Sequence, residues 1–356
     1  MVVPTLADLT ADWIGDLLIA NGHDVDVAGV TALPIGTGQV GATYRLTIDY
    51  DHASPGAPAT LIAKLPSIDD LSRATGKSHL TYLRESRFYQ QLADKKPLPI
   101  PGLLFIAFDE DTHDFALIMH DLIMHRAGNQ LAVPSRSDAE LSMDAAAAVH
   151  AAWWNDPMLD TLDWLNGTKA VPPPLDADAL FTMFWPAFCD RYPHEITPEI
   201  DKVGKAFLGR LGEWNAARSG VRCLTHGDFR ADNMLYRLGD DTIPVAVVDW
   251  QTVGVGSPAG DIGYYIGTSF DLLTRRQLEH ELVGRYRAKL IAHGVAEADV
   301  ATLWDDVRRS AVSGFLMGVT ASMVVEQTKR GDAMFLSMVE RSVAMILDYP
   351  DVALPA

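Results

Sequence analysis

The spacing of hydrophobic residues changes along the chain and predicts a helix followed by strands in its first part. Apolar residues recur at helical spacing in 1–22, which is typical of an amphipathic helix. Residues 43–49 alternate in type, and the apolar run 60–65 follows a turn-forming cluster at 51–58. We expect these two runs to pair as a β-hairpin.

Beyond this hairpin the pattern predicts one more helix and one more hairpin before it becomes helical. A helical segment at 80–93 is followed by three prolines, which end a helix. The strand-like runs 103–108 and 115–119 flank a polar cluster typical of a turn. From about residue 121, helical periodicity dominates, and only 222–250 is strand-like. The helical segments are 138–155, 176–192, 197–217, 275–293 and 298–346.

This order of elements predicts an α+β fold with two lobes, which a chain of 356 residues is long enough to form. We expect a small β-rich lobe over 1–120 and a large, mainly helical lobe over 121–356. The linker between them is expected near 119–122.

The acidic composition narrows the range of partners. The chain carries 29 Lys and Arg against 47 Asp and Glu, a formal net charge of −18, which repels phosphate backbones. We therefore expect no nucleic-acid partner. The sequence leaves the oligomeric state open.

No segment has the pattern of a membrane span or a secretory signal, and we expect a cytoplasmic protein. The N-terminal stretch carries three aspartates and no basic cluster. The most apolar late segment, 311–325, is too short to span a bilayer and is expected to be a buried helix. Cys189 and Cys223 match no zinc or disulfide spacing, so we expect two buried free thiols in a reducing compartment.

A glycine-rich turn, Gly36-Thr-Gly38-Gln-Val-Gly41, precedes the predicted strand 43–49. Glycines let backbone amides approach a phosphate group with no Cβ in the way. A dinucleotide-binding unit needs a helix after such a turn, whereas a strand is predicted here. The turn therefore favours a strand–glycine loop–strand flap over a nucleotide, as in kinases.

Lys64 lies in the apolar run 60–65, one strand after the glycine turn, and needs a partner because burying its charge alone is costly. Glu85 lies on the apolar stripe of the predicted helix 80–93. The two residues suggest an ion pair that directs Lys64 onto the α- and β-phosphates of the nucleotide. An edge-strand lysine and a solvated glutamate are the alternative.

The strand-like stretch 222–251 carries the strongest chemical signal. Asp228 lies in a short loop between apolar runs, Asn233 follows five residues later, and Asp249 ends the next apolar run. This order suits phosphoryl transfer from ATP, with Asp228 as the base and Asn233 and Asp249 as ligands of Mg²⁺. Arg230 is expected to reach the transferred phosphoryl group with its forked donors.

Three neighbouring residues are expected to support the site without taking part in the chemistry. His226 is interpreted as a buried histidine bonded to nearby backbone. Asp261 is interpreted either as the N-cap of the next helix or as a carboxylate that accepts the backbone amides of the catalytic loop. Asp232 is interpreted as solvated or as bracing the loop.

Together these motifs resemble the aminoglycoside phosphotransferase and choline-kinase-like superfamily, the small-molecule branch of the protein-kinase fold. The pattern His226-Gly-Asp228 with Asn233 is similar to that branch's catalytic loop, and Asp249-Trp-Gln stands where protein kinases have Asp-Phe-Gly. The segments 82–89, 225–235 and 261–269 resemble the ecdysteroid-kinase-like group and its bacterial relatives. The resemblance covers about residue 30 to the C-terminus.

The resemblance also implies where the nucleotide base and the acceptor bind. It implies that 117–122, with Met119 and Asp121, is a hinge whose backbone binds adenine. His120-Asp121-Leu122 departs from the Glu-Asp-Leu common in relatives, which leaves the details of the hinge open. Aromatic residues of the helical lobe either line the acceptor site or pack in the core: Trp153, Trp154, Trp185, Phe188 and Tyr192.

We therefore expect a kinase that uses ATP and Mg²⁺ to phosphorylate a hydroxyl of a small molecule. The sequence leaves open ATP or GTP as donor, and a steroid-like or other apolar alcohol, an aminoglycoside, choline or a sugar as acceptor. A nucleotide-binding pseudokinase that acts through a partner is the alternative, although every expected catalytic position is filled. A protein kinase fits least, because 252–258 is too short to dock a peptide.

Overall fold

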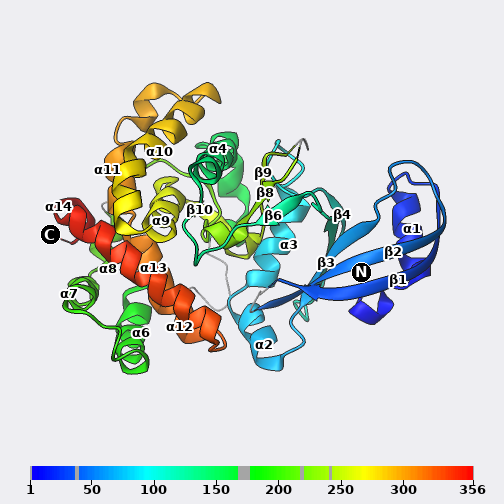
Figure 1. Cartoon of the computed structure of the whole chain (residues 1–356), viewed down its shortest axis with the longest axis horizontal. Helices are drawn as coiled ribbons and strands as arrows, with labels where there is room; N and C mark the ends of the chain where they lie inside the picture. Colours follow the sequence, from blue (N-terminus) through cyan, green and yellow to red (C-terminus); the bar gives the residue numbers. More distant parts are fainter. Residues whose placement is uncertain (1, 37–39, 167–176, 217–219, 240–242, 356) are drawn as a thin grey trace. The chain divides into compact units, whose positions relative to one another are not determined.

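The computed structural model describes residues 2–36, 40–166, 177–216, 220–239 and 243–355, which form two compact units (Figure 1). Unit 1 comprises Met1–Lys96, Ile100–His125 and Val248–Gln251. Unit 2 comprises Pro97–Pro99, Arg126–Val247 and Thr252–Ala356. The first unit thus runs five residues past the predicted boundary at 120 and also takes in the four residues that begin at Val248.

Unit 1 is built on an antiparallel sheet in the order β1-β2-β3-β5-β4. The predicted hairpins are present: β2 pairs with β3, with Thr43 opposite Lys64, and β4 pairs with β5. β1 precedes the glycine turn and pairs with β2. The strands are β1 (Val25–Ile35), β2 (Gly41–Ala53), β3 (Thr60–Pro66), β4 (Leu103–Phe108) and β5 (Phe115–His120).

The described part of unit 1 also contains three α-helices, and one of them was not predicted. The predicted N-terminal helix is α1 (Ala11–Ala20), which begins at the cap Thr10 and buries Ile14 and Leu18 against the sheet. The helix expected at 80–93 is α3 (Thr81–Gln91). Between β3 and α3 in the sequence lies α2 (Asp70–Ser78), a mostly polar helix with one large apolar residue, Leu71.

Unit 2 is mainly helical, and its helices account for every helical segment expected after residue 121. The last of these segments is divided into α11, α12 and α13 rather than continuous. The helices are α4 (Arg136–Ala152), α5 (Asp163–Asn166), α6 (Ala177–Arg191), α7 (Pro198–Phe207), α8 (Leu211–Ala216), α9 (Ala259–Ser269), α10 (Leu272–Ala292), α11 (Leu303–Arg309), α12 (Val312–Val324), α13 (Lys329–Asp348) and α14 (Pro350–Ala353).

Short strands carry the stretch that the sequence marked as strand-like. β8 pairs with β9 in an antiparallel hairpin, with Met234 opposite Val247, and β7 pairs with β10. Asn233 immediately precedes β8, so the hairpin fixes the end of the loop that carries Asp228. The strands are β6 (His125–Ala127), β7 (Cys223–Thr225), β8 (Met234–Arg237), β9 (Val245–Val247) and β10 (Gly254–Gly256).

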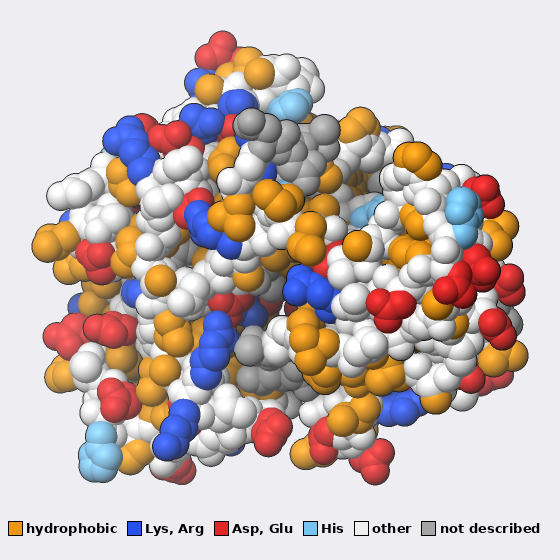
Figure 2. Space-filling view, turned by 45° about the vertical axis from the view of Figure 1, so that its right-hand side comes forward, with side chains coloured by type: hydrophobic (Ala, Val, Ile, Leu, Met, Phe, Trp, Pro, Cys, Tyr) orange, Lys and Arg blue, Asp and Glu red, His pale blue; other side chains and the backbone are white. Residues whose placement is uncertain are grey.

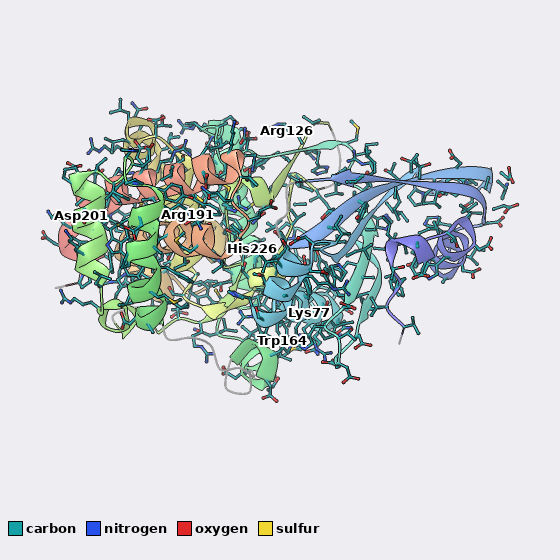
Figure 3. The ribbon with its side chains drawn as sticks, turned by 90° about the horizontal axis from the view of Figure 1, so that it is seen from below. Lys77, Arg126, Trp164, Arg191, Asp201 and His226 are labelled. Atoms are coloured by element: carbon teal, nitrogen blue, oxygen red, sulfur yellow. The ribbon has the colours of Figure 1, made fainter. Side chains whose placement is uncertain are left out.

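The helices of unit 2 pack through a buried aromatic core. Trp185 and Phe188 of α6 stack on each other and lie in the interior, and Trp185 also contacts Phe315 of α12. Arg191, labelled in Figure 3, donates to the carbonyl of Ser322 and so ties the end of α6 to α12. α12 is the apolar segment around 311–325 and packs against α13, which confirms that it is a buried helix.

The surface carries charges of both signs. On the face seen in Figure 2, Lys and Arg side chains lie among Asp and Glu side chains, with apolar side chains between them. Within the described part of the chain, no helix is both long enough and apolar enough to cross a membrane. Both cysteines are free thiols, but only Cys223 is fully buried, whereas Cys189 is partly exposed.

Candidate active site

The glycine turn joins two strands, as predicted. β1 ends at Ile35 and β2 begins at Gly41, while Gly38 lies outside the described residues. Gly36 has a φ of +77°, a conformation that L side chains rarely adopt. A Cβ on Gly41 would lie 3.4 Å from the carbonyl oxygen of Leu65, so the first residue of β2 lies close to the backbone of β3.

Lys64 and Glu85 form the predicted ion pair. The ammonium nitrogen of Lys64 lies 2.8 Å from Oε1 and 2.7 Å from Oε2 of Glu85, and 2.5 Å from Oδ1 of Asp249. Burial alone lowers the pKa of Lys64, but the carboxylates of Asp249 and Glu85 outweigh it and raise the pKa. Lys64 is therefore a permanently charged amine between two acids.

Asp249 is held in place by its neighbours in unit 1. Its φ of +69° is unusual for a residue with a side chain, although Asp tolerates it better than most. The next residue, Trp250, donates its amide to Oε1 of Glu85 at 3.2 Å and stacks on Phe88 with ring centroids 4.1 Å apart. Gln251 donates to the second oxygen of Asp249 at 2.9 Å.

Replacing Lys64 with Met tests the structural part of this arrangement. The variant keeps the apolar stem but leaves Glu85, which is 2% exposed, without its charged donor. We expect the free energy of unfolding to fall by about 2 kcal/mol, the scale of a lost hydrogen bond to a charged group. Urea denaturation measures it, and Lys205→Met, on a lysine that is 66% exposed, is the matched control with little effect.

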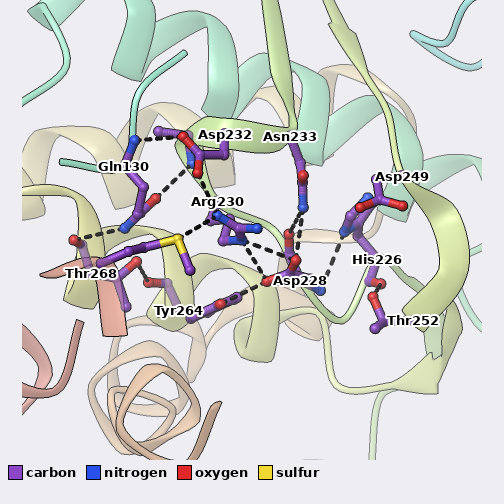
Figure 4. A network of polar contacts seen from close by, with 12 residues as sticks. Gln130, His226, Asp228, Arg230, Asp232, Asn233, Asp249, Thr252, Tyr264 and Thr268 are labelled. Atoms are coloured by element: carbon purple, nitrogen blue, oxygen red, sulfur yellow. Dashed lines mark hydrogen bonds and ion pairs between the residues drawn. The ribbon is translucent and has the colours of Figure 1, made fainter. Parts of the chain in front are cut away.

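Asp228 lies at the centre of a network of donors in unit 2 (Figure 4). Arg230 donates Nε–H to both carboxylate oxygens at 3.0 Å. Tyr264 donates its hydroxyl to Oδ1 at 2.7 Å, and Asn233 donates its amide to Oδ2 at 2.9 Å. All of these groups donate, so hydrogen bonds hold the carboxylate on both of its oxygens.

Arg230 lies against two acids of its own loop. Besides Asp228, its Nη1 donates to Oδ2 of Asp232 at 2.8 Å and contacts the sulfur of Met334 at 3.2 Å. Burial lowers the pKa of Arg230, but Asp228 leads a set of groups that raise it, so the guanidinium stays charged. The contact with the phosphoryl group that the sequence suggested remains a prediction.

The side-chain amide of Asn233 is oriented by Asp228. Its nitrogen donates to the backbone carbonyl of Asp228 at 2.8 Å as well as to Oδ2. Since both partners are acceptors, the nitrogen must face them, and the amide oxygen points elsewhere. This orientation leaves an oxygen of the type that Mg²⁺ prefers directed away from Asp228.

Asp261 braces the loop that carries Asp228, and its interpretation as an N-cap is wrong. α9 begins at Ala259, so Asp261 already lies inside the helix. Its carboxylate accepts the backbone amides of His226 at 2.7 Å and Gly227 at 2.9 Å. Nε2 of the buried His150 lies 3.1 Å from the same carboxylate, and its Nδ1 lies 2.7 Å from the hydroxyl of Tyr286.

Replacing Asp261 with Asn is expected to lower stability by about 2 kcal/mol near neutral pH, since it removes charge from a buried acceptor of amides. Burial raises the pKa of Asp261, but His150 leads the groups that lower it below the ordinary 3.8. The carboxylate therefore stabilises the fold above that pH, and this contribution is lost as the pH falls through the lowered value. Denaturation measures the free energy of unfolding of the native protein and of Asp261→Asn at pH 7 and pH 3. The difference between the two proteins should be smaller at pH 3.

Gln130 and Tyr264 also contact the loop that carries Asp228, although neither was among the candidate site residues. The backbone amide of Gln130 donates to the carboxylate of Asp232 at 2.8 Å. Its side-chain oxygen accepts from the backbone amide of Ala231 at 3.0 Å, and its side-chain nitrogen donates to the carbonyl of Thr268 at 2.9 Å. Asp232 therefore braces the loop, which was one of the two interpretations of this residue; the other was a solvated side chain. Tyr264 had one available signal: it follows Asp261 by three residues, which places both on the same face of a helix.

The predicted hinge residues lie at the end of β5. Met119 is buried in the sheet opposite Ile62 and Leu103. Asp121 has a buried side chain that pairs with Arg45 of β2 at 2.6 Å. This carboxylate is occupied within unit 1, so recognition of a base here would depend on backbone groups.

The aromatic residues proposed for the acceptor site are mostly core residues. Trp153, Trp185 and Phe188 are buried, and Tyr192 donates its hydroxyl to Asp332 at 2.6 Å. Trp154 is partly exposed. For at least three of these residues, therefore, packing explains their position.

Comparison with known proteins supports the resemblance seen in the sequence. Residues 179–295 match the sequence model of the ecdysteroid kinase-like family, and this range contains Asp228, Asn233 and Asp249. No curated protein matches the chain.

Solved structures of small-molecule kinases share the fold. An ethanolamine kinase from Plasmodium vivax is 10% identical, with a TM-score of 0.52 over 88% of this chain and 81% of that chain. A choline kinase from Streptococcus pneumoniae is 11% identical, with a TM-score of 0.51 over 95% and 99%. A variant of aminoglycoside 2′-phosphotransferase-IIIa bound to GDP is 15% identical, with a TM-score of 0.50 over 95% and 98%. The chain thus has the α+β fold of the aminoglycoside phosphotransferase and choline-kinase-like superfamily and is similar to its ecdysteroid kinase-like group.

Proposed function

We propose that this chain is a kinase that transfers the γ-phosphoryl group of ATP to a hydroxyl of a small molecule, with Asp228 as the base. The observation that carries the proposal is the setting of Asp228. Its carboxylate is 15% exposed and is held by three donor side chains within a loop that Asp261 braces. A base must be both fixed in position and accessible to the hydroxyl whose proton it accepts.

Lys64, Asn233 and Asp249 are proposed to hold the nucleotide and its metal. Lys64 is charged and rigidly held, which suits contact with phosphate oxygens. Asn233 and Asp249 offer one amide oxygen and one carboxylate, and Mg²⁺ accepts such ligands together with nucleotide oxygens and water. Bound Mg²⁺ would neutralise charge on the phosphates. The glycine turn, with Gly36 and Gly41, is proposed to cover them.

Counting acceptor positions on Asp228 indicates how an acceptor hydroxyl reaches it. A carboxylate offers about four lone-pair positions. Each oxygen here already accepts two bonds, because Arg230 donates to both and Tyr264 and Asn233 donate to one each. The hydroxyl must therefore replace a donor. Tyr264 and Asn233 are almost fully buried, whereas the Arg230 side chain is 16% exposed.

Arg230 is therefore the donor that we expect to give way. Its Nη1 remains bonded to Asp232, so the guanidinium stays beside the loop after Nε leaves Asp228. From there its donors can contact the phosphoryl group, where developing charge needs a cation. This sequence of contacts reconciles the predicted role of Arg230 with its observed pairing.

The test is transfer itself. Purified protein is incubated with a metabolite extract and either Mg·ATP or Mg·GTP, and mass spectrometry identifies compounds that gain one phosphoryl group. We expect one class of alcohols to gain it, and with one nucleotide in preference to the other. Nucleotide binding by calorimetry without any transfer would favour the pseudokinase alternative, and neither binding nor transfer would refute both.

A further inference from the structure

Helix α9 contacts the catalytic loop through one face. Asp261, Tyr264 and Thr268 are spaced by three and four residues, which places them in line along a helix. Asp261 accepts the amides that precede Asp228, and Tyr264 donates to Asp228 itself. The carbonyl of Thr268 accepts from Gln130, which holds Ala231 and Asp232. The helix thus braces the loop before, at and after Asp228.

Tyr264 is unusually well fixed for this contact. Its side chain is almost fully buried, and its ring packs in a cluster with Met334, Phe335 and Met338 of α13. Burial, followed by the charge of Asp228, raises the pKa of Tyr264 well above its ordinary value. The hydroxyl therefore keeps its proton and acts toward Asp228 as a donor.

An aspartate carboxylate needs such a partner if its orientation is to be unique. The terminal torsion of Asp is broad, so the carboxylate plane rotates easily without hydrogen bonds. Arg230 does not fix the plane during transfer if it gives way to the acceptor. Tyr264 at Oδ1 and Asn233 at Oδ2 then remain, one on each oxygen.

We propose that Tyr264 is a positioning residue for phosphoryl transfer, whose hydroxyl fixes the carboxylate of Asp228 toward the acceptor. This inference rests on the proposed function, because it requires Asp228 to be the base. Tyr264 does not touch the acceptor or the nucleotide in this role. It fixes the plane of the Asp228 carboxylate. The lone pairs to which Arg230 no longer donates then stay directed at the incoming hydroxyl.

Tyr264→Phe removes the hydroxyl and keeps the ring in its apolar cluster. With the acceptor found in the extract, we expect kcat to fall about 10- to 100-fold, the scale of a misplaced catalytic group. The KM for acceptor and the Kd for Mg·ATP should stay within about twofold, because neither ligand contacts the hydroxyl. Equal kcat in Tyr264→Phe and the native protein would overturn the proposal.

Tyr265→Phe is the matched control. It removes a buried hydroxyl from the next residue of α9, which contacts Tyr236 at 3.5 Å rather than Asp228. A purely structural role for these tyrosines predicts similar kcat values in both variants, whereas a positioning role predicts a loss only in Tyr264→Phe. Asp228→Asn, measured in parallel, separates the two claims: if it still transfers at the native rate, the base assignment fails.

Crystal structures of the native protein and of Tyr264→Phe, each with the identified acceptor bound, give a second measurement. We expect one orientation of the Asp228 carboxylate in the native complex. The variant complex should show a rotated carboxylate or two orientations. An unchanged carboxylate in the variant complex would show that Asn233 suffices after Arg230 gives way, and the inference would be wrong.

Discussion

Replacing Asp228 with Asn should lower kcat by about 10²- to 10⁴-fold, the usual contribution of a positioned general base. The substitution keeps the size of the side chain but removes its charge. The NH₂ group of the new amide cannot accept the hydrogen bonds that three side chains donate to the carboxylate: Arg230, Asn233 and Tyr264. The Kd for Mg·ATP should change little, because the nucleotide is assigned to other residues. Steady-state kinetics with the identified acceptor and calorimetry with Mg·ATP measure the two effects.

Asp232→Asn is the control for the loss of a carboxylate from the same loop. Asp232 also accepts from Arg230 and is about as buried, with its side chain 13% exposed. It braces the loop through Gln130, so we expect some loss of stability but transfer within about tenfold of the native rate. Equal losses of kcat in the two variants would mean that the network as a whole, rather than Asp228, supports the reaction.

Features set by short-range patterns were predictable from the sequence. The hairpins β2–β3 and β8–β9 follow from apolar runs separated by polar residues. The Lys64–Glu85 pair followed from a buried charge that needed a partner and from its order after the glycine turn. In each case the signal lies within the segment itself or in the order of neighbouring segments.

Among the helices that lie outside the predicted helical segments, α2 and α9 were missed for local reasons. α2 is nine residues long and carries one large apolar residue, Leu71, so its sequence offers no row of apolar residues that marks a buried helix face. α9 contains three glycines, which disfavour a helix in isolation, and it forms because ten of its eleven residues are buried in unit 2. Tertiary packing overrides propensity there.

Contacts around Asp228 were unpredictable for a different reason. Gln130 lies about 100 residues before the loop that it braces, and Tyr264 lies 36 residues after Asp228. No periodicity connects such positions. The orientation of the Arg230 side chain is set by its contacts with Asp232, two residues along the same loop, and with Met334 of α13. The residue types were visible, but their partners are a property of the fold.

Gly227→Ala is expected to have the largest effect on stability among these variants. Gly227 has a φ of +83°, and a Cβ there would lie 2.5 Å from the carbonyl oxygen of Thr252. The left-handed backbone costs an L-residue about 1–2 kcal/mol, and forcing atoms into a packed site costs about 1–3 more. We therefore expect the free energy of unfolding to fall by roughly 2–5 kcal/mol, measured by urea denaturation.

Gly209→Ala separates the two causes. Gly209 has a similar φ of +68°, but a Cβ there would meet no atom within 4 Å. This control should lose only the backbone part, about 1–2 kcal/mol. The excess loss in Gly227→Ala then measures the contact with Thr252, whose hydroxyl also donates to the carbonyl of His226. Equal losses would mean that the loop shifts freely away from Thr252, which would contradict a rigidly braced position for Asp228.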